Sequence, residues 1–314
     1  MACRGRLSDY LKNDFEELGT IGFQVVKNAV ANSSEMQSNI LNVVKMVKST
    51  YNPDDTLLLQ QYGIGELEVM WECRIATIPV WQKLFGTHNL ISSWDSLTYV
   101  TSEEQVKNAS MLNEYNEPDW LHRDQRCANS NLVDNIQGYL SLSDGDAKSH
   151  STIFYVYKYG SAQDMIDAFH AKFYTRKNRY GRVVHSSYDE SDFHLFSEEE
   201  LQWLRDHCKL VKPELEKGDL LLWCSAMPHA SAPDKTCDLM VNDRVGIFVS
   251  MMPKEYANVQ VLHNRRELSK QALTSSHNVL DPKLFPFSHK KSQVRKHPII
   301  LSKDIAKYRK KLIG

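Results

Sequence analysis

The sequence predicts a mainly β protein, an antiparallel sandwich or barrel preceded in the chain by helices. Three observations favour this fold class. From Leu90 onward, short segments rich in β-branched and aromatic residues are separated by turn residues, as in sheets of antiparallel strands. Before that point, apolar residues recur at helical spacing. The 314 residues, 42% hydrophobic and 25% charged, suit a folded protein with one large core or two modest ones.

The first ninety residues predict one strand and two helices. Residues Gly22–Val26 (GFQVV) have the composition of a strand. After Ser34, a helix is expected because Met36, Ile40, Val43, Val44 and Val47 fall on one face, and Ser34 with Gln37 has the pattern of a capping box. Residues 66–84 are also helical in character, up to Pro79 and Gly86.

Five strands are predicted for the sheet region. They are Leu90–Val100, Asn135–Asp144, Ser151–Gly160, Gly218–Trp223 and Arg244–Met252. A long polar segment with helical pieces, about residues 163–215, separates the third strand from the fourth. Because insertions of that length are often binding loops, we interpret it as lid-like.

The last 61 residues differ from the rest of the chain in charge. Residues 254–314 hold 14 Lys and Arg against 4 Asp and Glu, a net charge of +10, which leaves −11 for residues 1–253 of a chain whose total is −1. We therefore divide the chain into a main domain, 1–253, and a basic C-terminal extension, 254–314, with one short amphipathic helix at Ser302–Leu312. Contact with nucleic acid is one hypothesis for the extension; packing against the acidic body or a localisation signal is preferred.

Several function classes are disfavoured by the sequence. No apolar run approaches the roughly 20 residues of a membrane span, and the charged N-terminus does not resemble a signal peptide, so we expect a cytoplasmic or nuclear protein with no membrane partner. The six cysteines are scattered without a CxxC pair, which disfavours a zinc knuckle or a disulfide framework. No GxSxG elbow and no GxxxxGK loop is present.

One candidate metal site combines two separate motifs. His122 and Asp124 are two residues apart, so on extended backbone they project to one face. Alone this pair is weak, because about 1.5 such matches arise by chance from 12 histidines and 39 acids, and a surface ion pair explains it. His229, just beyond the apolar strand at 218–223, supplies a third ligand. Two histidines and one carboxylate form the facial set that suits non-haem Fe(II) and leaves coordination positions open for O₂ and a bidentate co-substrate.

A 2-oxoacid co-substrate with a second carboxylate also needs a cation at the far end of its pocket. Arg244, fifteen residues after His229 and at the start of a predicted strand, is our candidate, and Ser231 is placed to add a hydroxyl donor. Lys235 is a rival partner for the same carboxylate. For Arg244 alone, a salt bridge with a neighbouring aspartate is the simpler explanation.

These motifs, in this order, resemble the phytanoyl-CoA dioxygenase-like branch of the Fe(II)/2-oxoglutarate-dependent oxygenases. The resemblance covers most of residues 14–253 and rests on the segments DFEELGTIGFQVVKNAV, LFGTHNLISSWDSL, WLHRDQ, NIQGYLSLSD, the YGS turn, KGDLLLWCSAMPHASAP and the arginine-led strand that ends in Met-Pro. It implies a double-stranded β-helix, the jelly-roll or cupin-like fold, with helices outside.

The resemblance also implies the site residues and the reaction. Iron is expected at His122, Asp124 and His229, and the distal carboxylate of 2-oxoglutarate at Arg244 and Ser231, with Gln137 facing the same pocket. The implied reaction consumes O₂ and 2-oxoglutarate, releases succinate and CO₂, and hydroxylates a C–H bond of a small molecule.

The substrate is not specified by these motifs. Arg123 is larger than the residue that many members carry, Ala162 replaces a common histidine, and the 163–215 insertion lengthens the interval between the ligands. The insertion holds aromatic and basic residues that are able to cap an anionic substrate, although a solvated lid is the simpler interpretation: Phe173, Tyr174, Arg176, Lys177, Arg179, Tyr180 and Arg182. Two alternative functions stay open, a non-catalytic binding or assembly module of the same fold, and an oxygenase that acts on a nucleotide or nucleic acid through the basic extension.

Overall fold

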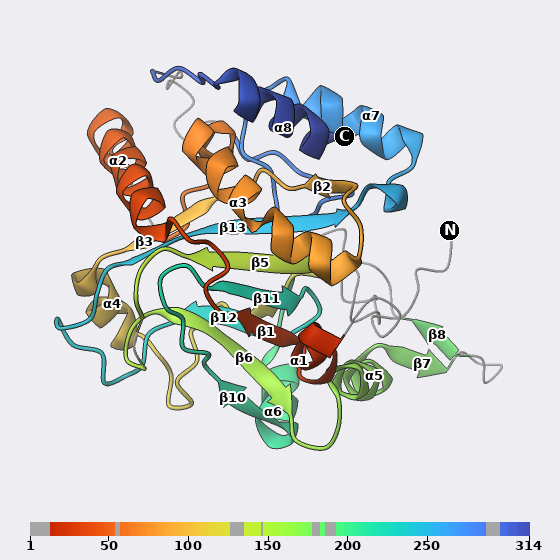
Figure 1. Cartoon of the computed structure of the whole chain (residues 1–314). Helices are drawn as coiled ribbons and strands as arrows, with labels where there is room; N and C mark the ends of the chain where they lie inside the picture. Colours follow the sequence, from red (N-terminus) through yellow and green to blue (C-terminus); the bar gives the residue numbers. More distant parts are fainter. Residues whose placement is uncertain are drawn as a thin grey trace.

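A computed structural model (Figure 1) describes residues 13–53, 57–125, 135–145, 147–177, 183–185, 193–286 and 296–314. Their backbone forms two facing antiparallel sheets with helices packed outside them (Figure 1). The mainly β prediction with flanking helices is therefore confirmed.

The first sheet contains six strands. Its strand order is β1-β11-β5-β13-β2, and β3 also pairs with β13. The bounds are β1 Phe23–Val26, β2 Leu90–Ser92, β3 Leu97–Val100, β5 Ile136–Ser141, β11 Leu220–Cys224 and β13 Arg244–Pro253. Nearly every residue of β5, β11 and β13 is buried, because this sheet is covered by helices on one side and by the second sheet on the other.

The second sheet contains five strands in the order β10-β6-β12-β4-β9. Their bounds are β4 His122–Arg123, β6 Ser151–Tyr157, β9 His194–Leu195, β10 Cys208–Val211 and β12 His229–Ala232. A separate two-stranded ribbon joins β7 Thr175–Lys177 to β8 Val183–His185.

The connectivity of these strands identifies the fold as a double-stranded β-helix. From β3 the chain passes to β4 in the second sheet, back to β5, across to β6 and β10, back to β11, across to β12 and back to β13. This alternation between two antiparallel sheets is the winding of a jelly roll. It places β4 next to β12 although more than a hundred residues separate them in the sequence.

The helices pack mainly on the outer side of the first sheet. The helices α2 Ser33–Tyr51, α3 Glu68–Phe85, α7 Val259–Ser269 and α8 Lys303–Ile313 lie beyond β13 and β2 (Figure 1). The remaining helices are α1 Glu16–Thr20, α4 Ser102–Ala109, α5 Ala162–Phe173 and α6 Glu198–His207. Gly138 in β5 permits the close approach of α3, because a Cβ atom there would lie 2.9 Å from the ring of Trp81.

The predicted apolar face of α2 is largely buried, but its predicted cap is wrong. Met36, Ile40, Val44 and Val47 are buried and Val43 is partly buried. The helix begins at Ser33 after an Asn32 N-cap with no side-chain hydrogen bond, so Ser34 lies inside the first turn and is not placed to cap it. Capping boxes are formed elsewhere, at the starts of α4, α5 and α6.

The single strand predicted at Leu90–Val100 is two strands in the structure. Both β2 and β3 pair with β13, and residues 93–96 between them leave the regular ladder. In that interval the Ser93 N–H donates to Ser250 O, and the buried Arg74 side chain donates from Nη2 to the Asp95 carbonyl. These hydrogen bonds replace part of the lost ladder.

Two long segments contribute to the core more than the sequence suggested. The segment expected as an insertion supplies both edge strands of the second sheet, since β10 pairs with β6 and β9 pairs with β4. In the basic extension, α8 matches its prediction within one residue, and its Leu312 and Ile313 are buried in the main hydrophobic core. None of the helices in the described part of the chain is long and apolar enough to cross a bilayer.

Candidate active site

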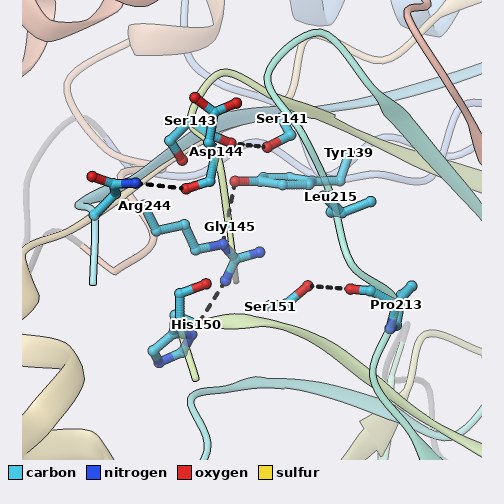
Figure 2. Close-up of a pocket in the computed structure, with 12 residues that line it drawn as sticks. Tyr139, Ser141, Ser143, Asp144, Gly145, His150, Ser151, Pro213, Leu215 and Arg244 are labelled. Carbon is cyan, nitrogen blue, oxygen red and sulfur yellow. Dashed lines mark hydrogen bonds between the residues drawn. The ribbon is translucent and has the colours of Figure 1, made fainter. Parts of the chain in front are cut away.

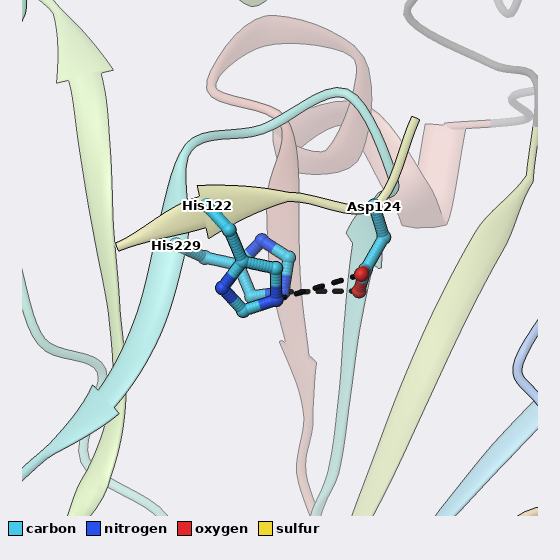
Figure 3. Close-up of side chains that lie close together, drawn as sticks. All are labelled: His122, Asp124 and His229. Atoms are coloured by element: carbon cyan, nitrogen blue, oxygen red, sulfur yellow. Dashed lines mark ion pairs between the residues drawn. The ribbon is translucent and has the colours of Figure 1, made fainter. Parts of the chain in front are cut away.

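Three side chains that could hold a metal ion converge between the sheets (Figure 3). His122 on β4 and His229 at the start of β12 are direct register partners, and Asp124 follows β4 immediately. The Nε2 atom of His122 lies 3.4 Å from Asp124 Oδ1, and that of His229 lies 3.3 Å from Asp124 Oδ2. One ligand atom from each residue lies within 4.8 Å of the others, in the one such cluster of three or more found among the described residues.

The backbone fixes which nitrogen each imidazole presents to this centre. His122 Nδ1 donates to the carbonyl of Trp120, at 3.0 Å, and His229 Nδ1 donates to that of Met227, at 2.8 Å. In both cases the acceptor lies two residues earlier in the chain. With Nδ1 donating to a backbone carbonyl, Nε2 of each ring faces the shared centre. Loss of the Nε2 proton on metal binding would leave the tautomer that a metal ligand needs.

The carboxylate of Asp124 is oriented from two sides. The backbone N–H of Asp124 donates to Ser225 O at 2.9 Å, which fixes the backbone of this residue. The side-chain amide of Gln137 on β5 donates to Asp124 Oδ2 at 2.8 Å. Gln137 Oε1 is buried and has no hydrogen-bond partner.

Aromatic rings surround the two histidines. Phe154 and Trp223 lie against the His229 ring, with centroids 6.1 and 5.5 Å away. Trp120 stacks on His122 at 5.5 Å, and Phe193 from the expected lid meets it edge-on at 6.4 Å. These rings limit the access of water to the ligands.

Electrostatics keep the carboxyl group ionised. Burial alone would raise the pKa of Asp124, but the positive charges of His277 and His122, with hydrogen bonds from the imidazoles of His122 and His229, hold that pKa well below its usual value. Burial, together with the charge of His122, lowers the pKa of His229. Burial alone would lower the pKa of His122, but the charge of Asp124 and the hydrogen bonds to Asp124 and to the Trp120 carbonyl raise it. The carboxylate and His229 therefore already have the charge state of metal ligands, and a metal ion that binds here would displace a proton from His122.

The donor set fits a divalent metal with open positions. Two ligands at right angles, each about 2.1 Å from a metal, are about 3 Å apart, close to the two observed His–Asp separations. Two imidazoles and one carboxylate on one side of the centre form the facial arrangement of non-haem Fe(II) sites. A structural zinc site would instead be closed by a fourth protein ligand.

A buried guanidinium lines a polar cavity near the start of β13 (Figure 2). Arg244, 4% exposed at the start of β13, donates from Nε to the Tyr139 hydroxyl at 3.2 Å and from Nη1 to Ser231 Oγ. Its guanidinium also stacks over the Tyr139 ring, 4.6 Å from the centroid. Its Nη2 is buried with no hydrogen-bond partner, and Arg244 lines a polar cavity. A buried cation with a spare donor is suited to a carboxylate.

The guanidinium and the metal ligands face the same interior. His229 and Ser231 are two residues apart on β12, and Gln137 and Tyr139 are two residues apart on β5, so each pair projects to one face. Two strand residues span about 7 Å. That length suits a five-carbon dicarboxylate whose ends reach the metal centre and Arg244.

The structure brings the predicted residues together at two centres. His122, Asp124 and His229 meet at one centre, and Arg244 and Ser231 meet at the second. Gln137, expected to face the same pocket, donates a hydrogen bond to Asp124 at the first centre. The rival Lys235 is exposed in the loop after β12, and Arg244 is buried.

Two functional neighbours were missed by sequence reasoning. Tyr139 holds Arg244, and the period of two along β5 from Gln137 would have identified it. His150, 5% exposed, hydrogen-bonds to Ser231 and had no sequence signal, because it lies in no motif.

Arg123 and Tyr174, two of the residues singled out as differing from the family pattern or as a possible substrate cap, do not point to the metal centre. Arg123, 1% exposed, faces away from His122 and packs against His170 and the rings of Phe169 and Tyr174. Tyr174 is buried and bonded to Glu200, so it forms no exposed cap. The side chains of the other basic and aromatic candidates from residue 176 to residue 182 lie outside the described residues.

Comparison with known proteins gives structural likenesses of low identity. No protein-family model and no curated protein matches the chain. Among solved structures, GlcNAc Inducible Gene 2 from Candida albicans is 14% identical, with 84% of this chain and 70% of that chain covered, at a TM-score of 0.47.

Two further similar structures were solved with ligands. EctD from S. alaskensis with bound Fe is 11% identical, with 79% of this chain and 78% of that one covered, at 0.45. The epimerase SnoN in complex with Fe3+, alpha ketoglutarate and nogalamycin RO is 9% identical, with 74% and 79% covered, at 0.42. Because these TM-scores are below 0.5, the likenesses by themselves assign neither family nor activity to this chain.

Proposed function

We propose that this chain is a non-haem Fe(II)- and 2-oxoglutarate-dependent dioxygenase, similar to the phytanoyl-CoA dioxygenase-like family, that hydroxylates a C–H bond of a small molecule and releases succinate and CO₂. The observation that carries the proposal is the combination of two centres in one interior. The histidine–aspartate–histidine cluster presents two Nε2 atoms and a carboxylate to one point. A buried arginine with an unused donor faces the same interior.

Each side chain has a distinct role in this proposal. His122, Asp124 and His229 would hold the iron, and Gln137 would keep the Asp124 carboxylate in its ligating orientation. Arg244 and Ser231 would bind the distal carboxylate of 2-oxoglutarate. Tyr139 holds Arg244 in place: its hydroxyl accepts a hydrogen bond from Arg244 Nε, and its ring stacks on the guanidinium.

The bound iron would supply the activation of O₂, coupled to oxidative decarboxylation of the co-substrate. The chain contributes positioning and a dry environment. The Trp120 and Met227 carbonyls hold both imidazoles with Nε2 toward the centre, and the rings of Phe154 and Trp223 keep water from His229.

The proposed catalytic unit is residues 1–253, with 254–314 as an extension that packs on it. The basic extension is also engaged within the fold: Arg265 is fully buried and Arg309 is paired with the buried Glu66. These contacts favour a small-molecule substrate over nucleic acid bound by the extension.

The proposal is tested by anaerobic titration of the purified protein with Fe(II) and 2-oxoglutarate, followed by exposure to air. We expect a charge-transfer absorption band on titration and slow formation of succinate in air, both lost in Asp124→Ala. Folded wild-type protein that gives neither signal would contradict the proposal and support a non-catalytic module.

A further inference from the structure

A buried histidine stands behind the proposed carboxylate site. His150 immediately precedes β6, is 5% exposed, and its backbone N–H donates to Gln105 Oε1 at 2.7 Å. Its Nδ1 lies 2.9 Å from Ser231 Oγ, and its Nε2 lies 3.3 Å from Asn108 Nδ2 on α4. In Figure 2 its ring lies on the opposite side of the Arg244 guanidinium from Tyr139.

This imidazole is neutral. Burial, with the positive charges of Arg244 and Lys212, holds the pKa of His150 well below its usual value. A neutral imidazole has one N–H donor and one acceptor nitrogen.

The neighbours of the ring determine where that single proton lies. Asn108 Nδ2 is an amide nitrogen and only donates, so the Nε2 atom of His150 accepts. The proton is therefore on Nδ1 and is donated to Ser231 Oγ. Arg244 Nη1, 3.4 Å from the same Nδ1, donates to Ser231 Oγ instead.

Ser231 consequently has both of its acceptor positions filled. A serine hydroxyl accepts two hydrogen bonds and donates one. His150 Nδ1–H and Arg244 Nη1–H occupy the two lone pairs, so the hydroxyl proton has to be donated to another acceptor. Arg244 Nη2, which has no partner, offers a second donor beside it.

We propose that His150 is a positioning residue that makes Ser231 an obligate hydrogen-bond donor to the distal carboxylate of the co-substrate. The inference rests on the proposed function and adds to it a chain of contacts, Asn108 to His150 to Ser231, that selects an acceptor-only group. A carboxylate satisfies both the serine hydroxyl and the arginine, whereas a terminal amide or hydroxyl would bring its own N–H or O–H against them.

The test measures equilibrium binding of 2-oxoglutarate to the anaerobic Fe(II)-loaded protein by calorimetry. His150→Leu removes the ring donor, and we expect about tenfold weaker binding of 2-oxoglutarate. His150→Asn keeps an N–H near the Nδ1 position, so we expect binding within about threefold of wild type. Thermal unfolding of each variant checks that it is folded.

Two controls separate positioning from general damage to the pocket. Pyruvate has the 2-oxoacid group without the distal carboxylate, so its weaker binding should be equal in wild type and His150→Leu. In a Ser231→Ala background, His150→Leu should cause no further loss, because the histidine acts through the serine.

Several results would overturn the inference while leaving the proposed function intact. They are unchanged 2-oxoglutarate binding in His150→Leu, equal losses in the Leu and Asn variants, an equal loss for pyruvate, or an additive loss in the serine variant. Folded wild-type protein that binds Fe(II) but no 2-oxoglutarate would contradict the proposed function and this inference together.

Discussion

At the scale of single residues, the site depends on backbone carbonyls that fix the orientation of both metal-facing histidines. The two metal-facing histidines use the same local contact, Nδ1 to the carbonyl two residues earlier, although one lies on β4 and the other on β12. The spacing of His122 and Asp124 was enough to predict that they share a face. The position of His150 was not predictable, because its hydrogen-bonding role depends on α4 and β12, which are distant in sequence.

Arg244 and Lys235 can be distinguished by a matched pair of variants. Arg244→Met removes the buried guanidinium, and we expect 2-oxoglutarate to bind to the Fe(II)-loaded protein about 10- to 100-fold more weakly, as for a charge-assisted bond of about 1.5–3 kcal/mol. Lys235→Met, at an exposed loop position, should bind as wild type does. The opposite ranking in calorimetry would transfer the role to Lys235.

At the scale of elements, β9 and α6 are held beside the metal ligands by a buried polar cluster. Glu200 on α6 accepts hydrogen bonds from His194 Nε2 on β9, at 3.1 Å, and from the Tyr174 hydroxyl after α5. The strand β9 in turn pairs with His122 and Arg123 of β4. The sequence predicted a solvated lid because charged residues such as Glu200 are usually exposed. The hydrogen-bond partners that allow Glu200 to be buried cannot be identified from the sequence.

This cluster predicts a pH dependence of stability. Burial alone would raise the pKa of Glu200, but hydrogen bonds from His194, Tyr174 and the Ser197 backbone lower it to about 2 from 4.5. Because the folded pKa is depressed, the stabilisation is present above about pH 4.5 and is lost as the pH falls from there toward 2, about 3 kcal/mol in all.

Urea unfolding of Glu200→Gln between pH 7 and pH 2.5 checks this dependence. The variant should be less stable than wild type at pH 7, and the difference should shrink through the acid range. Glu199→Gln, at an exposed position one residue earlier, is the control and should follow wild type throughout. A difference for Glu200→Gln that stays constant with pH would disprove the ionic contribution.

The pairing of β13 with β5 predicts a second effect at this scale. A Cβ atom at Gly246 would overlap the Tyr139 hydroxyl, and the Tyr139 side chain is too buried to move away. Gly246→Ala should therefore cost about 1–3 kcal/mol of stability and weaken 2-oxoglutarate binding through the displaced support of Arg244.

Gly145→Ala is the matched control for that variant. It lies at the same end of the sandwich, and its Cβ atom would first meet Ser149 Oγ at 3.1 Å. We expect a smaller loss in thermal unfolding. If Gly246→Ala leaves both the melting temperature and the affinity unchanged, Tyr139 does not support Arg244 as described.

At the scale of the whole molecule, the sequence predicted the long apolar strands of both sheets better than the shortest strands of the second sheet. The residues of β5, β6, β11 and β13 form long apolar runs, and such runs favour strands over other structures. In contrast, β4 and β9 have two residues each and exist only through pairing with neighbours far away in sequence. No local pattern encodes such partners.

The basic extension is a structural part of the molecule. Arg265, fully buried, donates to the carbonyls of Ser92, Leu312 and Ile313, and so joins α7, α8 and β2. From its net charge, the sequence left three interpretations open: contact with nucleic acid and, as the two preferred ones, packing against the acidic body or a localisation signal. Net charge does not reveal that several of the cations are internal partners.

Removal of residues 302–314 is expected to destabilise the whole protein. It would remove the Leu312 and Ile313 acceptors of Arg265 and the Arg309 partner of the buried Glu66, and would expose the surface under Leu312, for a loss of about 3–5 kcal/mol in denaturant unfolding. The double variant Lys310→Gln, Lys311→Gln removes exposed charge alone and should unfold as wild type does. A truncated protein as stable as wild type would mean that α8 is dispensable for the fold.

The central claim is that His122, Asp124 and His229 hold one iron and that Arg244 faces the co-substrate bound to it. A crystal structure of the protein grown anaerobically with Fe(II) and 2-oxoglutarate tests it most directly. The account predicts anomalous density for one metal bonded to these three residues, with the distal carboxylate of 2-oxoglutarate on Arg244 and Ser231. Iron bound elsewhere, or 2-oxoglutarate with its distal carboxylate away from Arg244, would contradict the account.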